Sequence, residues 1–346
     1  MASSESARQA LRTVLAGDDL TSAATEELFG RLMDGELSDV VKAALLGGLA
    51  AKGEAIEEIA GAASAMRARA VGIPHTVDDL VDTCGTGGDG KGTFNVSTAA
   101  AIVAAGAGVP VAKHGNRSVS SRSGSADVLA ALGVDLEITP EQAGRALEQI
   151  GLAFLFAPKL HPAMREVMPV RKELGVRTIF NLLGPLTNPA GAARQVMGVY
   201  AARLVEPVAH VLARLGATHA LVVHGADGLD EITTTGPTHV AEVRDGAVTT
   251  STLDPAALDI ERAAARDLLG GEPDDNAEIF RRLLDGEEGP IFDIVVANAG
   301  AAIFVGGRAP SLRDGAEQAR VALRSGAAHA KLEALRGVPG ALEGES

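Results

Sequence analysis

The strongest constraint on the fold is a change in hydrophobic pattern near residue 80. Before it, apolar residues such as Leu28, Leu32, Leu45 and Leu49 recur only at helical spacing, and no strand-like run is present. After it, short apolar runs alternate with helical stretches. Such alternation is typical of a mostly parallel sheet with helices on its faces. We therefore expect an α/β protein with a small all-helical N-terminal domain and a large domain whose mostly parallel central sheet is flanked by helices.

The expected domain boundary lies near residue 75. A length of 346 residues fits two domains, or one large domain with a small satellite. The helical domain is expected to cover residues 1–75 and also about 165–185, which has the pattern of helix and loop, and residues 76–346 form the large domain. The candidate strands are LVDTC, VPVAK, LAFLF, VMGVY and HALVVHG, followed by a hairpin of THVAEV and AVTTSTL around RDG.

Three loops rich in polar residues follow three of these strands directly. They are the glycine-rich stretch after LVDTC, KHGNRSVSSRSGS after VPVA, and HGADGLDE after HALVV. In open α/β sheets, ligands bind at the carboxyl ends of the strands. The three loops should therefore share one edge of the sheet and form one ligand site.

The glycine-rich stretch DTCGTGGDGKGTFNVSTAAA (82–101) has five glycines between Gly85 and Gly92. It partly fits the dinucleotide pattern G-x-G-x-x-G, but the position of the expected ribose-binding acid falls in a basic segment. It also nearly fits a P-loop, but Gly92 stands where a magnesium-binding hydroxyl is required. A general anion site fits better: glycines let backbone N–H groups converge, and NVST (95–98) caps a following helix. An exposed surface loop is the alternative.

The charge distribution favours a small polyanion over nucleic acid. The net charge of −14, the aromatic content of 3% and the absence of Trp argue against a nucleic-acid or anionic-membrane surface. No acidic residue lies between Asp89 and Asp127, however, and this window carries Lys91, Lys113, His114, Arg117 and Arg122. It indicates a site for a polyanionic small molecule, with chance clustering in a Gly/Ala/Ser-rich region as the alternative.

Cysteine content and hydropathy indicate the compartment. The single cysteine, Cys84, excludes an internal disulfide and a multi-cysteine metal site, and we expect it to be a small buried residue. The N-terminal sequence has no apolar core of signal-peptide type, and no apolar run is long enough to span a membrane. We therefore expect a cytoplasmic protein that does not associate with membranes.

Candidate chemistry is concentrated in a few residues. Asp230 and Glu231 form a carboxylate pair that would suit Mg²⁺ beside a diphosphate, with Ser97 adding a hydroxyl; a surface acidic pair is the alternative. Arg171 is a candidate carboxylate clamp. His161 fits either a site or a structural role. No nucleophile–base pair stands out, which favours displacement of pyrophosphate or phosphate from a sugar, where the charge to be managed lies on the leaving group.

Six stretches taken together carry a family resemblance. In chain order they are GTGGD (85–89), NVST (95–98), KHGNRSVSS (113–121), HPAMR (161–165), RTIFNLLGPLTNP (177–189) and DGLDE (227–231). The set resembles the anthranilate phosphoribosyltransferase family. The resemblance implies transfer of phosphoribosyl from 5-phosphoribosyl 1-diphosphate to the amine of anthranilate in tryptophan biosynthesis. It also implies a homodimer, formed through the helical domain, with the nucleoside phosphorylase/phosphoribosyltransferase class III fold.

The resemblance also implies roles for individual residues. No nucleophile or base is assigned, and Arg171 and Asn116 act by positioning. The metal ligands are Ser97, Asp230 and Glu231, which hold two Mg²⁺ ions per active site. The anthranilate contacts are Gly85, Asn116, His161, Arg171 and Pro185. The donor contacts are Gly85, Gly88, Asp89, Thr93, Asn95, Val96, Ser97, Thr98, Lys113, His114, Gly115, Asn116, Arg117, Ser118, Val119, Ser120, Ser121 and Ser125.

Two alternatives stay open at this point. A pyrimidine nucleoside phosphorylase shares the fold and a glycine loop but uses inorganic phosphate; the intact KHGNR and the Asp230-Glu231 pair favour the diphosphate donor. A nucleic-acid-binding relative of the fold is the non-enzymatic alternative. The charge of −14, HPAMR and Arg171 argue against it.

Overall fold

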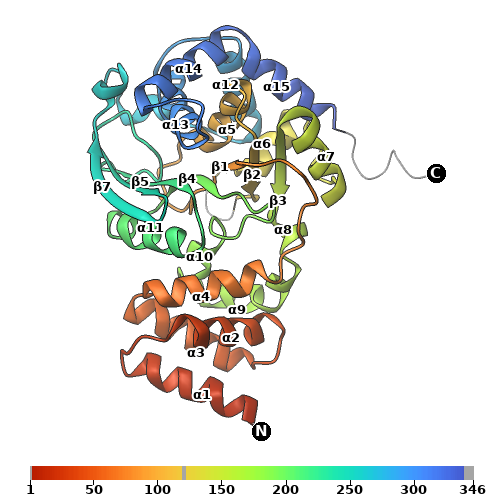
Figure 1. Ribbon diagram of the computed structural model, residues 1–346, viewed down its shortest axis with the longest axis vertical. Helices are drawn as coiled ribbons and strands as arrows, with labels where there is room; N and C mark the ends of the chain where they lie inside the picture. The colour runs from red at the N-terminus through yellow and green to blue at the C-terminus, as the bar shows by residue number, and fades with distance from the viewer. Residues whose placement is uncertain (1, 119–121, 339–346) are drawn as a thin grey trace, which may run out of the picture.

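The computed structural model describes residues 2–118 and 122–338. A helical unit and an α/β unit lie end to end along the longest axis, with the N-terminus at the far end of the helical unit (Figure 1). Among the described residues, no helix is both long and apolar enough to cross a bilayer.

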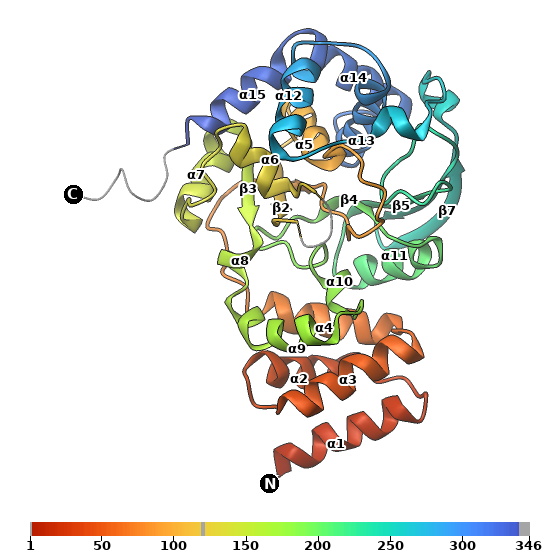
Figure 2. The ribbon, with the colours of Figure 1, turned by 180° about the vertical axis from the view of Figure 1, so that it is seen from behind.

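Four N-terminal helices and one later helix build the helical unit. The four are α1 (Ala2–Leu15), α2 (Ser22–Met33), α3 (Asp39–Lys52) and α4 (Ile56–Arg67). The fifth, α9 (Met168–Leu174), packs against α3, as both ribbon views show (Figures 1 and 2). The predicted leucines are buried here because their helical spacing places them on one face of each helix. The domain boundary at residue 75 stays a prediction, since one apolar cluster continues from this unit onto the sheet.

The central sheet has seven strands in the order β3-β2-β1-β4-β5-β6-β7. The first five pair in parallel and the last two antiparallel, which confirms the predicted mostly parallel sheet and the late hairpin. Their bounds are β1 (Val81–Asp82), β2 (Val111–Gly115), β3 (Leu152–Phe156), β4 (Arg194–Gly198), β5 (His219–Gly225), β6 (Thr238–Arg244) and β7 (Ala247–Leu253).

Helices cover both faces of the sheet, so the parallel strands are buried on both sides. On one face α5 (Val96–Gly106) and α13 (Pro290–Val305) pack on the strands, with α12 (Pro273–Leu284), α14 (Leu312–Arg324) and α15 (Ala327–Arg336) outside them. On the other face lie α7 (Pro140–Ile150) and α11 (Val205–Arg214). Short helices α6 (Ser125–Ala131), α8 (Ala157–Leu160) and α10 (Phe180–Leu183) complete the loops.

The first strand is shorter than the apolar run LVDTC predicts. It ends at Asp82, because the Asp82 carboxylate accepts hydrogen bonds from the backbone N–H groups of Cys84 and His114 at 3.0 and 3.2 Å. A side chain thus takes the partners that a longer strand would have used. The chain leaves the sheet two residues early and enters the glycine-rich loop.

Candidate active site

The three polar loops meet at the carboxyl edge of the sheet. The backbone N–H of Gly87 donates to Asp230 Oδ2 at 2.7 Å, which joins the glycine loop to the loop after β5. The N–H of Ser97, at the start of α5, donates to Glu231 Oε1 at 3.2 Å. Asn95 Nδ2 donates to the carbonyl of Ser123 at 3.1 Å, in the loop after β2. The predicted shared edge is therefore present, because β1, β2 and β5 run parallel.

The glycine loop has a backbone that side chains would strain. Gly87, Gly88, Gly90 and Gly92 all have positive φ, between 63° and 79°. Glycine adopts this conformation at no steric cost. The loop is tied to β4, where the N–H of Thr86 donates to the Gly198 carbonyl at 2.8 Å and Gln195 Nε2 donates to the Cys84 carbonyl at 3.2 Å. The chain can therefore present main-chain groups closely to a ligand along this stretch.

The start of α5 differs in one detail from the predicted capping. Asn95 stands at the N-cap, but its side chain makes no cap hydrogen bond; it binds Ser123 and Asn276 instead. The carboxylate of Glu231 takes the N–H of Ser97, so the helix end is satisfied from another loop. Thr93 lies in an isolated bridge with Leu269, and Val96 and Thr98 are buried. The N-terminus of α5 still faces the site, where its partial positive charge favours an anion.

The acidic residues of the site are crowded around one buried cation. Burial, and then the charge of Asp89, raises the pKa of Asp230 to about 7. Burial and the charge of Asp230 raise the pKa of Glu231 well above its usual value, and Lys113 opposes that shift. Lys113 is 3% exposed, and its Nζ lies 3.5 Å from Ser97 Oγ. The cluster has more carboxylates than cations, so a cation bound there would relieve the repulsion.

The basic loop after β2 is fixed by hydrogen bonds to α6, the helix that follows it. Asp127, in α6, accepts the N–H groups of Ser118 and Gly124 through Oδ2, and Arg117 Nη1 binds its Oδ1 at 3.0 Å. Ser125 Oγ bonds to the backbone of the exposed Asn116. Gly115 ends β2, and Lys113 and His114 are buried within it. The predicted donor contacts Val119, Ser120 and Ser121 lie outside the described residues.

Two buried histidines form a pair beside this loop. His114 Nδ1 lies 3.1 Å from the carbonyl of Gly184, which only accepts, so this nitrogen carries the proton. His114 Nε2 is then an acceptor, and His161 Nε2 donates to it at 3.2 Å. Burial lowers the pKa of His114 to about 3 and that of His161 to about 4. Both rings are neutral at pH 7, and His161 Nδ1 is buried without a partner in the described structure.

Arg171 provides a guanidinium without an acidic partner. It is half-buried on α9 and stacks 5.5 Å above the Phe180 ring, while its Nη1 lies 3.8 Å from Met168 Sδ. No carboxylate in the described part of the chain pairs with it, and burial lowers its pKa. A planar, desolvated and unpaired guanidinium is well suited to bind a carboxylate in a bidentate fork. The predicted neighbour Pro185 is buried next to Gly184.

Comparisons with known proteins decide the family. Models of the glycosyl transferase family match residues 8–70, as its helical bundle domain, and 77–329, as its a/b domain. An anthranilate phosphoribosyltransferase from Anaeromyxobacter sp. (strain K) is 54% identical over 328 residues, or 95% of this chain and 97% of that protein. The chain belongs to the anthranilate phosphoribosyltransferase family. It is therefore an enzyme of the glycosyltransferase class, as the six stretches indicated.

Solved structures of this family agree with that assignment. The anthranilate phosphoribosyltransferase from Thermus thermophilus has a TM-score of 0.91 and 49% identity, covering 95% of this chain and 98% of that one. The Saccharomyces cerevisiae enzyme in complex with PRPP and Mg has a TM-score of 0.87 and 27% identity, covering 96% and 97%. The same yeast enzyme with 4-fluoroanthranilate has a TM-score of 0.86 and 26% identity, again covering 96% and 97%.

Sequence reasoning missed a buried carboxylate beneath the site of this family member. Asp82 is 1% exposed, and besides its two backbone donors it accepts Asn188 Nδ2 at 2.7 Å. It thus joins the glycine loop, the end of β2 and the NLLGPLTNP segment. Burial raises the pKa of Asp82 to about 6, against the pull of Lys113. An acid at the end of an apolar strand was the signal that could have revealed it.

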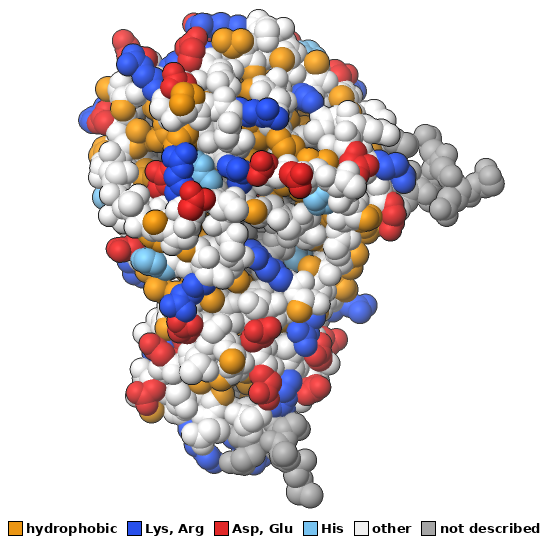
Figure 3. All heavy atoms as spheres, viewed as in Figure 1, with side chains coloured by type: hydrophobic (Ala, Val, Ile, Leu, Met, Phe, Trp, Pro, Cys, Tyr) orange, Lys and Arg blue, Asp and Glu red, His pale blue; other side chains and the backbone are white. Residues whose placement is uncertain are grey.

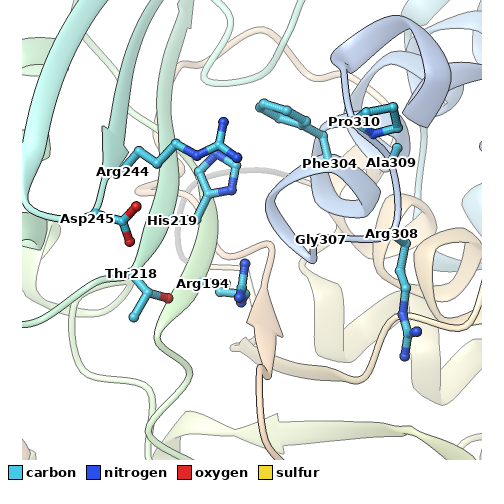
Figure 4. A pocket seen from close by; sticks show the side chains of 10 residues that line it. All are labelled: Arg194, Thr218, His219, Arg244, Asp245, Phe304, Gly307, Arg308, Ala309 and Pro310. Carbon is cyan, nitrogen blue, oxygen red and sulfur yellow. The ribbon is translucent and has the colours of Figure 1, made fainter.

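A large cavity lies away from this site. It measures about 590 Å³ and is lined by residues at the opposite ends of the strands, among them Arg194, His219 and Arg244 (Figure 4). Arg194 donates to Asp79 and to the carbonyl of Val305 at the end of α13, and His219 pairs with Glu242. Arg194 is therefore neutralised by Asp79, and the cavity shares no residue with the loops of the family's motifs.

Proposed function

We propose that this chain transfers the phosphoribosyl group of 5-phosphoribosyl 1-diphosphate to the amine of anthranilate, giving N-(5-phosphoribosyl)anthranilate and pyrophosphate, as a step of tryptophan biosynthesis. The observation that carries the proposal is the meeting of the glycine loop, the basic loop and the Asp230-Glu231 turn within hydrogen-bonding distance. The yeast relatives bound to PRPP, Mg and 4-fluoroanthranilate support the same substrates.

The donor subsite is proposed to lie between the glycine loop and the basic loop. The diphosphate would bind at Gly85, Gly88 and Asp89 and at the N-terminus of α5, from Thr93 to Thr98. Lys113 to Ser121 and Ser125 would hold the phosphoribosyl part. Main-chain N–H groups, hydroxyls and a buried ammonium are the donors that phosphate oxygens require. No acidic residue lies between Asp89 and Asp127, so the stretch from 90 to 126 adds no negative charge to this wall.

Mg²⁺ is proposed to bind at Ser97, Asp230 and Glu231, with two ions per active site. The donors are hard oxygens, and the raised carboxylate pKa values show charge that a cation would offset. In the described residues no group of three His, Cys, Asp or Glu side chains could hold a metal unaided. Water and diphosphate oxygens would therefore complete the shell, as Mg²⁺ prefers. When bound, Mg²⁺ supplies charge neutralisation of the leaving pyrophosphate.

The acceptor subsite is proposed to lie at Arg171, Asn116 and the Gly184-Pro185 turn. Arg171 would grip the anthranilate carboxylate, and Asn116, Gly85, His161 and Pro185 would contact the ring and amine. The neutral histidine pair gives this wall a low charge. A planar aromatic acid fits such a lining of one cation and several apolar or neutral groups.

The mechanism we infer rests on positioning. The anthranilate nitrogen attacks ribose C1 as the bond from C1 to the diphosphate oxygen breaks, and C1 acquires oxocarbenium character. An arylamine is neutral at pH 7, so no strong general base is required, and the amine proton leaves after the N–C1 bond forms. Holding both reactants in line supplies much of the rate enhancement, and fixed donors around the pyrophosphate supply the electrostatic part.

We propose three further properties of the enzyme. The enzyme forms a homodimer through the helical unit, which light scattering would test. It is cytoplasmic, which fractionation would test. Residues 1–75, with about 165–185, form one domain and 76–346 the other, which limited proteolysis would test.

The direct experiment follows the loss of anthranilate fluorescence with donor and Mg²⁺ present. The chain has no Trp, so protein emission interferes little. Loss that requires both donor and Mg²⁺ is expected; no loss with pure folded enzyme would overturn the proposal. Inorganic phosphate with a pyrimidine nucleoside serves as the control for the phosphorylase alternative, and no cleavage is expected. Acidic and basic side chains are interspersed on the face drawn in Figure 3, so we expect no salt-dependent DNA binding either.

A further inference from the structure

Arg177 connects the glycine loop to the segment that carries Arg171. It lies in the connection between α9 and α10, and its Nη1 donates to the Gly88 carbonyl at 3.2 Å. Its guanidinium stacks over the Tyr200 ring, 4.6 Å from the ring centroid. An arginine over an aromatic face at this distance makes a favourable cation–π contact. The side chain therefore touches two segments far from its own position in the sequence.

Tyr200 is itself fixed to the glycine loop. The Tyr200 N–H donates to Thr86 Oγ1 at 3.0 Å, and the Thr86 N–H donates to Gly198 at 2.8 Å. The chain after β4 and the start of the loop thus hold each other. Two residues further on, Gly88 has a positive φ of 79° and is exposed. Arg177 completes the arrangement, because it donates to the Gly88 carbonyl and stacks on the ring of Tyr200, whose backbone N–H is bound by Thr86.

Arg177 and Arg171 are held by the same short segment. Arg177 follows Arg171 by six positions, and α9 ends between them at Leu174, with Gly175 as its C-cap at a φ of 63°. Arg171 stacks on Phe180, and the Phe180 ring lies 5.7 Å from that of Phe29 in α2. One side of this segment therefore rests on the helical unit, and the other reaches the glycine loop. A shift of the segment would move both guanidinium groups.

We propose that Arg177 is a positioning residue that holds the glycine loop for the diphosphate of the donor. The proposal rests on the function proposed above. It assigns Arg177 no contact with the reacting atoms. Loss of Arg177 leaves Gly88 free to rotate and weakens donor binding, whereas loss of Arg171 weakens acceptor binding.

Tyr200 gives a direct test that does not depend on activity. It is the only Tyr in a chain without Trp, so intrinsic protein emission reports on this residue alone. Burial raises its pKa, and the charge of Arg177 opposes that shift. In Arg177→Gln we expect the phenol to titrate at higher pH and its emission to be quenched more readily by acrylamide. Lys172→Gln is the matched control, because Lys172 is an exposed cation on the same segment.

Steady-state kinetics give the second test. Arg177→Gln should raise the donor KM about tenfold, the effect expected for one such contact, with little change in the anthranilate KM at saturating donor. Tyr200→Phe keeps the ring and should raise the donor KM less than Tyr200→Leu. Lys172→Gln should match the wild-type enzyme.

The two tests separate this proposal from the proposed function. Unchanged Tyr200 quenching and titration in a folded Arg177→Gln variant would overturn the contact itself. Altered spectra with an unchanged donor KM would overturn the positioning role. If the wild-type enzyme fails to consume anthranilate, the proposed function is wrong. The role of Arg177 is then tested by the binding of pyrophosphate with Mg²⁺, measured through Tyr200 emission. Equal pyrophosphate affinity in the wild-type protein and in Arg177→Gln would overturn the positioning role.

Discussion

A Cβ placed on Gly198 would overlap with the carbonyl oxygen of Asp230. The end of β4 and the turn that bears the carboxylate pair are therefore in direct backbone contact, which only glycine permits. Gly198 also accepts the N–H of Thr86, and Asp230 accepts that of Gly87. Three segments are thus held around one residue that has no side chain.

Gly198→Ala should displace the turn and lower kcat/KM for the donor by roughly a hundredfold or more, since that loss corresponds to only about 2.7 kcal/mol of transition-state stabilisation. The Mg²⁺ concentration for half-maximal rate should rise as well. Gly236→Ala is the control. Gly236 lies in the loop that bears the carboxylate pair, and a Cβ at this position would meet no heavy atom within 4 Å. Equal rates for both variants would show that the contact does not position the carboxylates.

Arg171→Gln should raise the KM for anthranilate while the KM for the donor stays close to the wild-type value. Hydrogen bonds to charged groups contribute about 1.5–3 kcal/mol, so an increase of roughly ten- to a hundredfold is expected. Initial rates over both substrate concentrations provide the measurement, with Lys172→Gln as the matched control. A similar rise in both KM values would argue against an acceptor clamp at Arg171.

The buried histidine pair predicts loss of stability in acid. The folded pKa values of His114 and His161 are lowered to about 3 and about 4, so the unfolded chain takes up protons below pH 6.5 that the folded protein does not. Taken alone, each ring should make the free energy of unfolding fall by about 1.4 kcal/mol per pH unit as the pH decreases from 6.5, whereas the raised folded pKa values of Asp82 and Asp230 act in the opposite direction. Urea unfolding between pH 6.5 and 4.5 should therefore show the contribution of the ring as a difference in slope, with His161→Gln losing stability less steeply, or gaining it more steeply, than the wild-type enzyme.

The control for this pH dependence is His239→Gln, at an exposed position of β6. It should keep the wild-type slope. A slope that is the same in all three proteins would mean that the pair does not remain neutral in the folded state.

Cys84 should react slowly with thiol reagents in the folded enzyme. Burial, followed by the charge of Asp82, raises the pKa of the thiol to about 12, so almost no thiolate is present at pH 8. Because the chain has a single cysteine, modification by a chromogenic disulfide gives one phase. The rate should rise strongly in urea. Cys84 is partly buried rather than fully buried as the sequence predicted, and fast modification at low denaturant would contradict the raised pKa of its thiol.

The sequence predicted the sheet well where strands are buried and apolar. HALVVHG coincides with β5 because all seven of its residues are buried between helix layers. It overestimated the first strand, since Asp82 competes for the backbone donors there. The sequence predicted that Asn95 caps α5. The acceptor that binds the N–H of Ser97 is instead Glu231, which lies more than 130 positions further along the chain. The histidine pair and Arg177 were not foreseen as contacts for the same reason.

The sequence by itself determined the order of helices and strands, the three polar loops after strands, and the six stretches that mark the family. These follow from periodicity and residue type, which act over short distances along the chain. Only the tertiary structure decided which loop donates to which carboxylate, why glycine is required at position 198, and that Arg177 binds the Gly88 carbonyl. Those contacts depend on the packing of segments far apart in sequence, and the resulting burial sets the pKa values of Asp82, Asp230 and the histidines.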